Sequence, residues 1–346
     1  MPNITTLEQL KKISEILLDE QSGHGQLLQT CQDFFTLGET LSGIGEQSTE
    51  ASQATDTILP NGKAVSPLTA ARCVREYART SCFVRGLYEA LLEAQQRFPG
   101  QTIHALYAGC GPYATLILPL LARLPRDSFR FTLIDIHPLA LESAKKIINH
   151  FGFEDFIQDY QLLDACTTSL VPFQPFHVAV TETMNQAMYK EPQLAVSANL
   201  VRYLEPDGIL IPEQITVKAA LIDSSREITC FPSDHQGEMI ALPRRRLELG
   251  TIMLLDKTTL KLLDLNNPAT HLPPITLPWP NETVREKMRL GLLTHIKVFG
   301  SHCLQCYDTS LTIPKILRIN ATPDEALEVE FCYRLGESPG FDYRFI

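Results

Sequence analysis

Residues 104–118, HALYAGCGPYATLIL, decide the fold of this chain. The apolar residues 103–108 predict a strand that ends at Ala108 and runs straight into Gly109-Cys110-Gly111. Glycine at such a turn lets the backbone approach a ligand, because no Cβ stands in the way. The apolar residues 112–124 then predict a helix, which would point its free N–H groups at the ligand. The stretch therefore predicts a nucleotide-cofactor loop.

The sequence after this loop alternates between apolar strands and amphipathic helices. Strands are predicted at 103–108, 129–135, 158–163, 176–181 and 208–212, and helices at 112–124, 138–150 and 190–204. This alternation is typical of an α/β, Rossmann-like, doubly wound sheet. Ligands of such sheets bind beyond the carboxyl ends of the strands. We therefore expect the loop, Asp135, Asp164 and Glu182 to open onto one crevice.

Different patterns flank this region on both sides. Residues 1–70 predict an N-terminal helical segment and mobile lid, with helices at 6–20 and 27–41 and a polar, mobile loop or linker at 45–63. Residues 59–73 would close over the cofactor, with the polar stretch before them acting as a hinge. Residues 71–213 would form the cofactor domain, beginning with one long helix over 66–98. Residues 214–346 predict a β-sandwich or barrel-like domain.

The composition of the chain argues against several classes of partner and site. The 346 residues are 44% hydrophobic and carry a formal net charge of −10, which argues against duplex nucleic acid as a partner. No apolar run reaches the roughly 18 residues that cross a bilayer, and the N-terminus lacks a leader pattern, so a cytoplasmic location is expected. The nine cysteines follow no disulfide framework, and the lone Cys303-Leu-Gln-Cys306 predicts no metal site.

Two cofactor classes fit the loop. Gly109-x-Gly111-x-x-Ala114 matches the dinucleotide fingerprint of NAD-dependent oxidoreductases. A carboxylate at Asp135 can accept hydrogen bonds from a ribose diol of either NAD or S-adenosylmethionine, and Asp164 can bind an exocyclic adenine amine. Asp135 lies 26 residues after Gly109, more than the roughly 20 usual for NAD. The neighbours Ile136 and Ala165 complete the predicted cofactor contacts.

Residues 200–217, LVRYLEPDGILIPEQITV, favour the second class. This segment resembles the late helix-turn-strand of class I S-adenosylmethionine-dependent methyltransferases. Within that superfamily the chain resembles the protein arginine methyltransferases. Tyr77-Ala-Arg79-Thr80 is similar to that family's Val-Arg-Thr helix. The resemblance implies that Arg79 binds the methionine carboxylate of the cofactor, as a guanidinium can do with two parallel hydrogen bonds.

Two acidic residues extend the resemblance. Thr181-Glu182-Thr183-Met184, followed by Glu191, is similar to the family's hairpin with two glutamates. The resemblance implies that Glu182 and Glu191 grip a guanidinium and aim its nitrogen at the methyl group, where alignment contributes much of the catalysis. A carboxylate can also take the proton that is lost after transfer. The resemblance further implies that residues 214–346 are a β-rich domain for substrate binding and dimerisation, and that the chain forms a homodimer.

The chain departs from the family in the parts that surround the substrate. The family's loop reads Asp-x-Gly-x-Gly-x-Gly, whereas this chain has Tyr107-Ala-Gly109-Cys-Gly111-Pro-Tyr113. The family's Thr-His-Trp string and the Trp-Gly of its glutamate hairpin are not evident; the nearest string is Thr294-His295-Ile296. The predicted acceptor is therefore an amine or guanidine of a small molecule or peptide. A small-molecule O- or N-methyltransferase, an NAD-dependent oxidoreductase and a non-catalytic cofactor-binding protein remain the alternatives.

Overall fold

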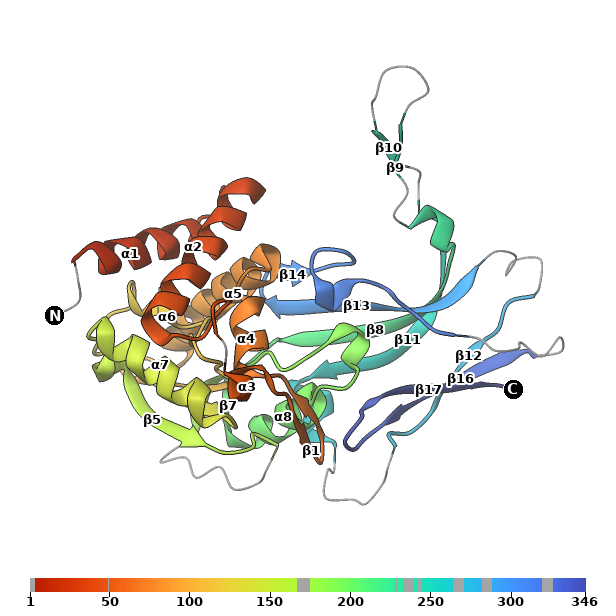
Figure 1. Cartoon of the computed structure of the whole chain (residues 1–346). Helices are drawn as coiled ribbons and strands as arrows, with labels where there is room; N and C mark the ends of the chain where they lie inside the picture. Colours follow the sequence, from red (N-terminus) through yellow and green to blue (C-terminus); the bar gives the residue numbers. More distant parts are fainter. Residues whose placement is uncertain are drawn as a thin grey trace.

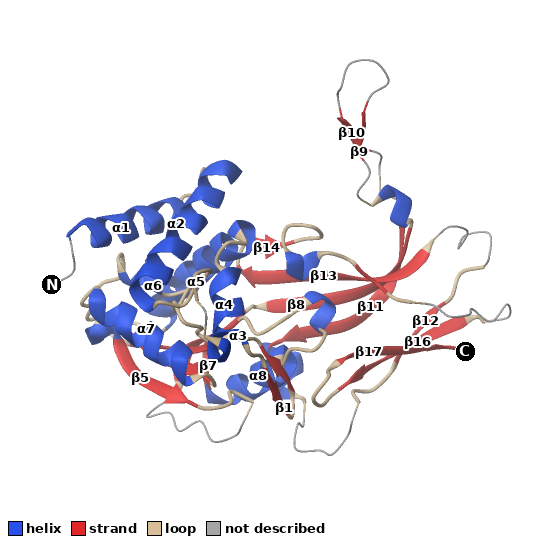
Figure 2. Cartoon of the chain, in the orientation of Figure 1, coloured by secondary structure: helices blue, strands red, loops and turns tan. Residues whose placement is uncertain are grey.

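The computed structural model describes residues 4–48, 50–166, 175–227, 244–263, 271–281, 288–318 and 326–346, together with the backbone of two short strands at 230–232 and 239–241. N-terminal helices and a helix-flanked parallel sheet form one part, and long antiparallel strands extend from it to form the other (Figures 1 and 2). This is the arrangement that the sequence predicts. None of the described helices is long and apolar enough to cross a membrane.

The central sheet has five strands in the order β5-β4-β3-β6-β7, and all neighbouring pairs are parallel. Its strands are β3 (Ile103–Ala108), β4 (Phe129–Asp135), β5 (Ile157–Leu162), β6 (Phe176–Thr181) and β7 (Leu204–Ile211). Every residue of β6 is buried, as expected for a parallel strand covered on both faces. The doubly wound α/β sheet is therefore confirmed.

Helices cover the sheet and build the N-terminal layer. The longer ones are α1 (Ile4–Leu18), α2 (His24–Ser42), α5 (Tyr77–Arg97), α7 (Pro138–His150) and α8 (Gln193–Leu200). The apolar faces of α1, α2 and α5 meet in one core, to which Leu10, Phe34 and Phe83 contribute fully buried side chains. The N-terminal helices are thus packed against the α/β part of the chain.

Most of the described strands of the C-terminal part form two antiparallel sheets, and a separate pair of short strands lies outside them. One sheet holds β8 (Gln214–Ile222), β11 (Arg246–Asp256), β13 (Arg289–Phe299), β14 (His302–Leu304) and the two-residue β15 (Lys315–Ile316). The other holds β12 (Ile275–Pro278), β16 (Glu328–Arg334) and β17 (Gly340–Phe345). Helix α5 packs on the first sheet at Gly86, where a Cβ would lie only 2.6 Å from Val298.

The remaining elements are short. They are α3 (Ala51–Ala54), β1 (Thr57–Leu59), β2 (Gly62–Ala64), α4 (Pro67–Cys73), α6 (Leu118–Leu121), η1 (Glu154–Phe156), η2 (Gln186–Met188), η3 (Val201–Tyr203), η4 (Ser224–Arg226), β9 (Cys230–Pro232), β10 (Met239–Ala241), α9 (Lys257–Lys261) and η5 (Ser310–Thr312). The polar stretch 45–63, predicted to be a mobile loop or linker, therefore contains a short helix and most of the β1–β2 hairpin.

The predicted helix over 112–124 is wrong for most of its length. Turns follow Gly111, Ala114 takes a positive φ of 46°, and only α6 (Leu118–Leu121) is an α-helix. The physical reason is Tyr113, whose ring is fully buried against Gly38 of α2 and whose hydroxyl donates to the Ile44 carbonyl. Tertiary contacts thus hold this segment out of the helical conformation.

The predicted long helix over 66–98 is broken into α4 and α5. Glu76, between them, has a ψ of 79°, and its carboxylate accepts from the distant Ser310 N–H as well as from Arg79 in α5. Two further boundaries also differ. The helix predicted at 190–204 is α8 followed by η3, and β7 begins at Leu204 rather than at residue 208. The described residues of segment 309–319 form η5 and the short β15.

Candidate functional site

A cavity of about 300 Å³ lies at the carboxyl ends of β3, β4 and β6. It brings together ten of the eleven residues that the sequence singles out. These are Arg79, Gly109, Cys110, Gly111, Asp135, Ile136, Asp164, Ala165, Glu182 and Glu191. The eleventh, Ala108, is fully buried at the end of β3 and does not line the cavity.

The glycine loop forms one wall of the cavity. Gly109 and Gly111 have positive φ angles of 72° and 63°, which favour glycine, and a Cβ on Gly109 would lie 2.6 Å from Thr183. The Gly109 and Cys110 N–H groups both donate to the Ile134 carbonyl, at 2.8 and 3.1 Å. The loop therefore uses these two donors within the protein, and turns rather than the predicted helix start follow it, since α6 begins only at Leu118.

Asp135 organises the loop from the end of β4. One carboxylate oxygen accepts from the Gly111 N–H at 2.9 Å, and the other accepts from the His137 N–H at 2.9 Å. The imidazole Nδ1 of His137 lies 3.3 Å from the same second oxygen. A carboxylate offers about four lone-pair positions. Asp135 is thus fixed in orientation and retains capacity for a ligand hydroxyl.

Asp164 follows the end of β5 on the same side of the cavity. Its Oδ1 accepts from the Cys166 N–H at 2.9 Å, so this carboxylate also orders its own loop. The next residue, Ala165, is also fixed in position, because the Asn199 side chain donates to the Ala165 carbonyl at 2.9 Å. Asp135 and Asp164 are therefore both rigidly placed at adjacent strand ends.

The opposite end of the cavity holds a buried ion pair. The Nε of Arg79 donates to Oε2 of Glu182 at 2.9 Å, and a second guanidinium nitrogen, Nη2, contacts the same oxygen. Nη1 donates to Glu76 at 3.3 Å. The Arg79 and Glu182 side chains are only 11% and 12% exposed. Helix α5 and the segment after β6 are thus joined at this point.

Each carboxylate of the glutamate pair is in an unusual state. The second oxygen of Glu182, Oε1, is buried without a hydrogen-bond partner among the described residues. Burial raises the pKa of Glu182, and the Arg79 guanidinium opposes that shift. Burial, with the nearby Glu182 charge, raises the pKa of Glu191 to about 7. Together the two groups can accept hydrogen bonds from a cation and can exchange a proton near neutral pH.

The segment that carries Glu191 is anchored by the β16–β17 hairpin. The Tyr333 hydroxyl donates to the Met188 carbonyl at 2.6 Å, and the Tyr189 hydroxyl donates to the Phe341 carbonyl at 2.7 Å. The Lys190 N–H donates to the Pro339 carbonyl at 2.8 Å. Residues 183–191, here called the acceptor loop, are therefore held in place by the C-terminal part of the chain.

Several cavity residues were not identified from the sequence. Glu76 was assigned to the interior of a continuous helix, which conceals its role as a partner of Arg79. The cavity is also lined by Lys63, Ser310 and Leu311, which are distant in sequence from the predicted site residues. Only His137 could have been identified from the sequence, because it lies two residues after Asp135, directly beyond the end of a predicted strand. Thr294 and His295 lie within β13 and do not line the cavity.

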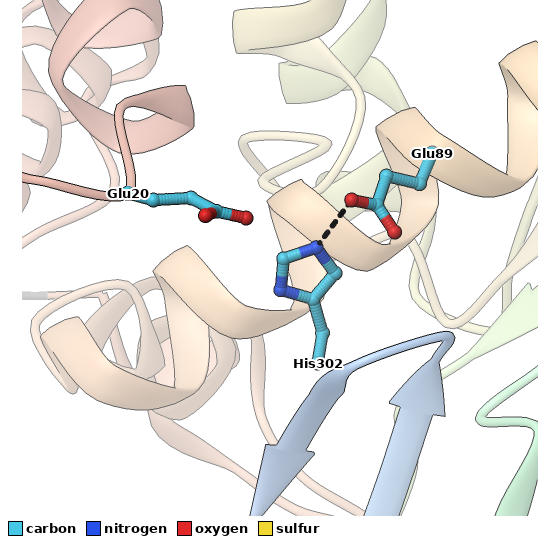
Figure 3. A group of neighbouring side chains, drawn as sticks. All are labelled: Glu20, Glu89 and His302. Atoms are coloured by element: carbon cyan, nitrogen blue, oxygen red, sulfur yellow. Dashed lines mark ion pairs between the residues drawn. The ribbon is translucent and has the colours of Figure 1, made fainter.

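One group outside the cavity offers three ligand atoms of the kinds that metals prefer. Glu20, Glu89 and His302 place one such atom each within 4.8 Å of the others (Figure 3). Nε2 of His302 lies 3.0 Å from Glu89, so these two side chains form an ion pair when the imidazole is protonated. The Glu89 side chain is 44% exposed and Glu20 is exposed, so water can satisfy both. We assign no ligand to this group.

Comparisons with known proteins show which solved structures have a similar fold. No family model matches the chain, and no curated protein is detectably similar to it in sequence. The solved Trypanosoma brucei PRMT1 enzyme-prozyme heterotetrameric complex with AdoHcy is similar in structure, with a TM-score of 0.52 at 11% identity. The match covers 79% of this chain and 90% of that one. A structure of PRMT6 matches with a TM-score of 0.48 at 11% identity, covering 75% and 95% of the two chains. The chain therefore has the fold of the trypanosomal PRMT1, with N-terminal helices, a parallel central sheet and a β-rich C-terminal part.

Proposed function

We propose that this chain is an S-adenosylmethionine-dependent methyltransferase that methylates an amine or guanidine nitrogen. The fold supports this proposal, and so does the ligand of the trypanosomal neighbour, whose structure is a complex with AdoHcy, the demethylated cofactor. The observation that carries the proposal is the unpartnered, buried Oε1 of Glu182 at one end of the cavity. A buried acceptor without a partner is costly, and a ligand N–H would satisfy it.

The residues around the cavity fit the cofactor. A guanidinium has five N–H donors, and three of those on Arg79 are used by Glu182 and Glu76. Two donors remain for the methionine carboxylate. Asp135 accepts from the ribose hydroxyls, and Asp164, with Ile136 and Ala165 beside it, accepts from the adenine amine. The bound group supplies an electrophilic methyl on a sulfonium.

The glutamates act on the acceptor. Oε1 of Glu182 and the carboxylate of Glu191 hold its cationic head by charge-assisted hydrogen bonds, which are stronger than neutral ones. They orient one nitrogen toward the methyl group, and this alignment lowers the barrier to displacement. Glu191 would take a proton from the cationic acceptor, and the acceptor nitrogen would then form the N–C bond with the methyl group that the cofactor supplies, leaving the cofactor as AdoHcy. A pKa of about 7 suits Glu191 to this step.

Calorimetric titration tests the cofactor directly. We expect micromolar binding of S-adenosylmethionine and AdoHcy and none of NAD, followed by transfer of labelled methyl to a panel of amines and guanidines. Binding of NAD alone would assign the glycine loop to an oxidoreductase. Cofactor binding without transfer to any nitrogen or oxygen acceptor would favour a non-catalytic binding protein, and transfer to hydroxyls alone would make the chain an O-methyltransferase.

The proposal extends to assembly and location. The trypanosomal neighbour is part of a heterotetrameric complex, and we place a homodimer contact on residues 214–346, which we regard as the substrate and dimerisation domain. All eight described cysteines are free thiols, which supports a reducing, cytoplasmic setting. Sedimentation of the purified chain would test the dimer.

A further inference from the structure

We propose that the β1–β2 hairpin positions the acceptor carboxylate Glu191, and that Gly62 is the residue that allows it to do so. This inference rests on the proposed function, in which Glu191 binds the acceptor. The hairpin lies beside the start of α8, directly against the segment that carries Glu191 (Figure 1). It belongs to the N-terminal segment, so it is remote in sequence from the residues it touches.

The contact between hairpin and acceptor loop is backbone on backbone. The Lys63 N–H donates to the Lys190 carbonyl at 2.6 Å. At Gly62, an added Cβ would lie 3.0 Å from the Lys190 oxygen, the Glu191 carbonyl carbon and the Pro192 nitrogen. Gly62 also has a φ of 137°, which side chains other than hydrogen rarely adopt. Only glycine at this position lets the two segments approach so closely.

The other end of the hairpin is tied to the cofactor end of the cavity. The Thr57 hydroxyl lies 3.2 Å from Nε2 of His137, whose Nδ1 is 3.3 Å from Asp135. Asp56 stabilises the hairpin, because its carboxylate accepts from the Lys63 ammonium at 2.7 Å and from the Ser66 N–H at 2.8 Å. The hairpin therefore spans the cavity from the predicted ribose site to the acceptor loop.

The hairpin also affects the charge of the acceptor carboxylate. Lys63 lines the cavity, and its ammonium lowers the pKa of Glu191 against the larger effects of burial and of Glu182. A displaced hairpin would leave Glu191 without this cation and without the backbone that fixes residues 190–192. Docking of the hairpin thus keeps Glu191 in place and keeps the Lys63 cation near it.

Hydrogen–deuterium exchange measured by mass spectrometry tests the inference with and without AdoHcy. In Gly62→Ala, we expect exchange of segments 57–64 and 186–192 to be faster than in the native chain, on the order of tenfold, because the docked backbone is released. AdoHcy should slow exchange of both segments in the native chain and of neither in Gly62→Ala. The matched control is Gly100→Ala, because Gly100 also has a positive φ, of 78°, but nothing lies within 4 Å of its added Cβ. The control should exchange like the native chain in both segments.

A second variant separates docking from simple loss of folding. Thr57→Val removes the bond to His137 and leaves Gly62 unchanged, so we expect normal exchange at 186–192 without ligand and a weaker response there to AdoHcy. Native exchange at 186–192 in Gly62→Ala, or an undiminished AdoHcy response there, overturns the inference. If AdoHcy fails to bind the native chain, the proposed function fails, while the ligand-free comparison of Gly62→Ala with Gly100→Ala still decides whether the hairpin holds the acceptor loop.

Discussion

Replacing Glu191 by glutamine should stabilise the protein at alkaline pH. The pKa of Glu191 is about 7, against an ordinary value of 4.5, chiefly because the carboxyl is buried and lies near Glu182. Each pKa unit corresponds to about 1.4 kcal/mol, so the charged form is disfavoured in the folded protein by about 3 kcal/mol. Because the pKa of Glu191 is raised in the folded protein, the protonated carboxyl contributes its full stability below pH 4.5. This contribution is lost as the pH rises to about 7. Glutamine keeps the shape of the side chain and never ionises.

Chemical denaturation followed by circular dichroism can measure this difference. We expect Glu191→Gln to exceed the native free energy of unfolding by about 1 kcal/mol at pH 5 and by about 3 kcal/mol at pH 8. The control is Glu248→Gln, whose side chain is 55% exposed in an ion pair with Lys218 and should contribute little at any pH. An equal difference at pH 5 and pH 8, or a loss of stability at pH 8, would refute the reasoning. The expected gain would mark a residue kept for its chemistry at a cost in stability.

Three further predictions concern single side chains. Asp135→Ala should weaken AdoHcy binding by about 1–3 kcal/mol in calorimetry, because the Gly111 N–H loses its partner along with the ligand; unchanged affinity would remove Asp135 from the cofactor site. Glu182→Gln should leave AdoHcy affinity nearly unchanged and abolish methyl transfer, and retained turnover would end its catalytic assignment. Burial lowers the pKa of His177, whose Nδ1 accepts from the His104 N–H at 2.9 Å, so the native chain should lose stability as pH falls below about 6.5. In His177→Phe, denaturation should show a smaller loss between pH 7 and pH 5; an equal loss would place the acid sensitivity elsewhere.

Much of the fold follows from patterns that are local in sequence. The predicted bounds of β3, β4 and β6 agree with the structure, because a buried parallel strand reads as a short apolar run between turn residues. The chemistry at strand ends is also local. Asp135 and Asp164 come directly after strands, and parallel strands present their carboxyl ends at one edge of the sheet. Their meeting in one cavity could therefore be expected from the sequence.

What the sequence could not give depends on contacts between distant segments. Tyr113 prevents the predicted helix because Gly38, 75 residues earlier, leaves room for its ring: a Cβ there would lie 2.6 Å from it. Glu76 breaks the long helix where its carboxylate accepts from the Ser310 N–H at 3.0 Å, across the length of the chain. Helical periodicity compares only residues three and four positions apart, so it cannot reveal either of these distant partners. The β1–β2 hairpin was missed for the same reason, since polar residues alone indicate a loop.

Of the two altered positions of the glycine loop, Tyr107 lines the cavity, whereas Tyr113 falls on packing. Tyr113 stands where the arginine methyltransferases have their third glycine, yet it is fully buried against α2 and does not line the cavity. The Gly109 and Cys110 N–H groups donate to the Ile134 carbonyl, so they are not the groups that would distinguish one cofactor from another. In the proposed function, recognition comes instead from two cavity side chains: Arg79 for a carboxylate and Asp135 for a diol. A dinucleotide needs a free N–H cradle for its pyrophosphate, whereas S-adenosylmethionine has no phosphate to bind. The loop geometry thus favours the adenosyl cofactor on physical grounds that are independent of the family resemblance.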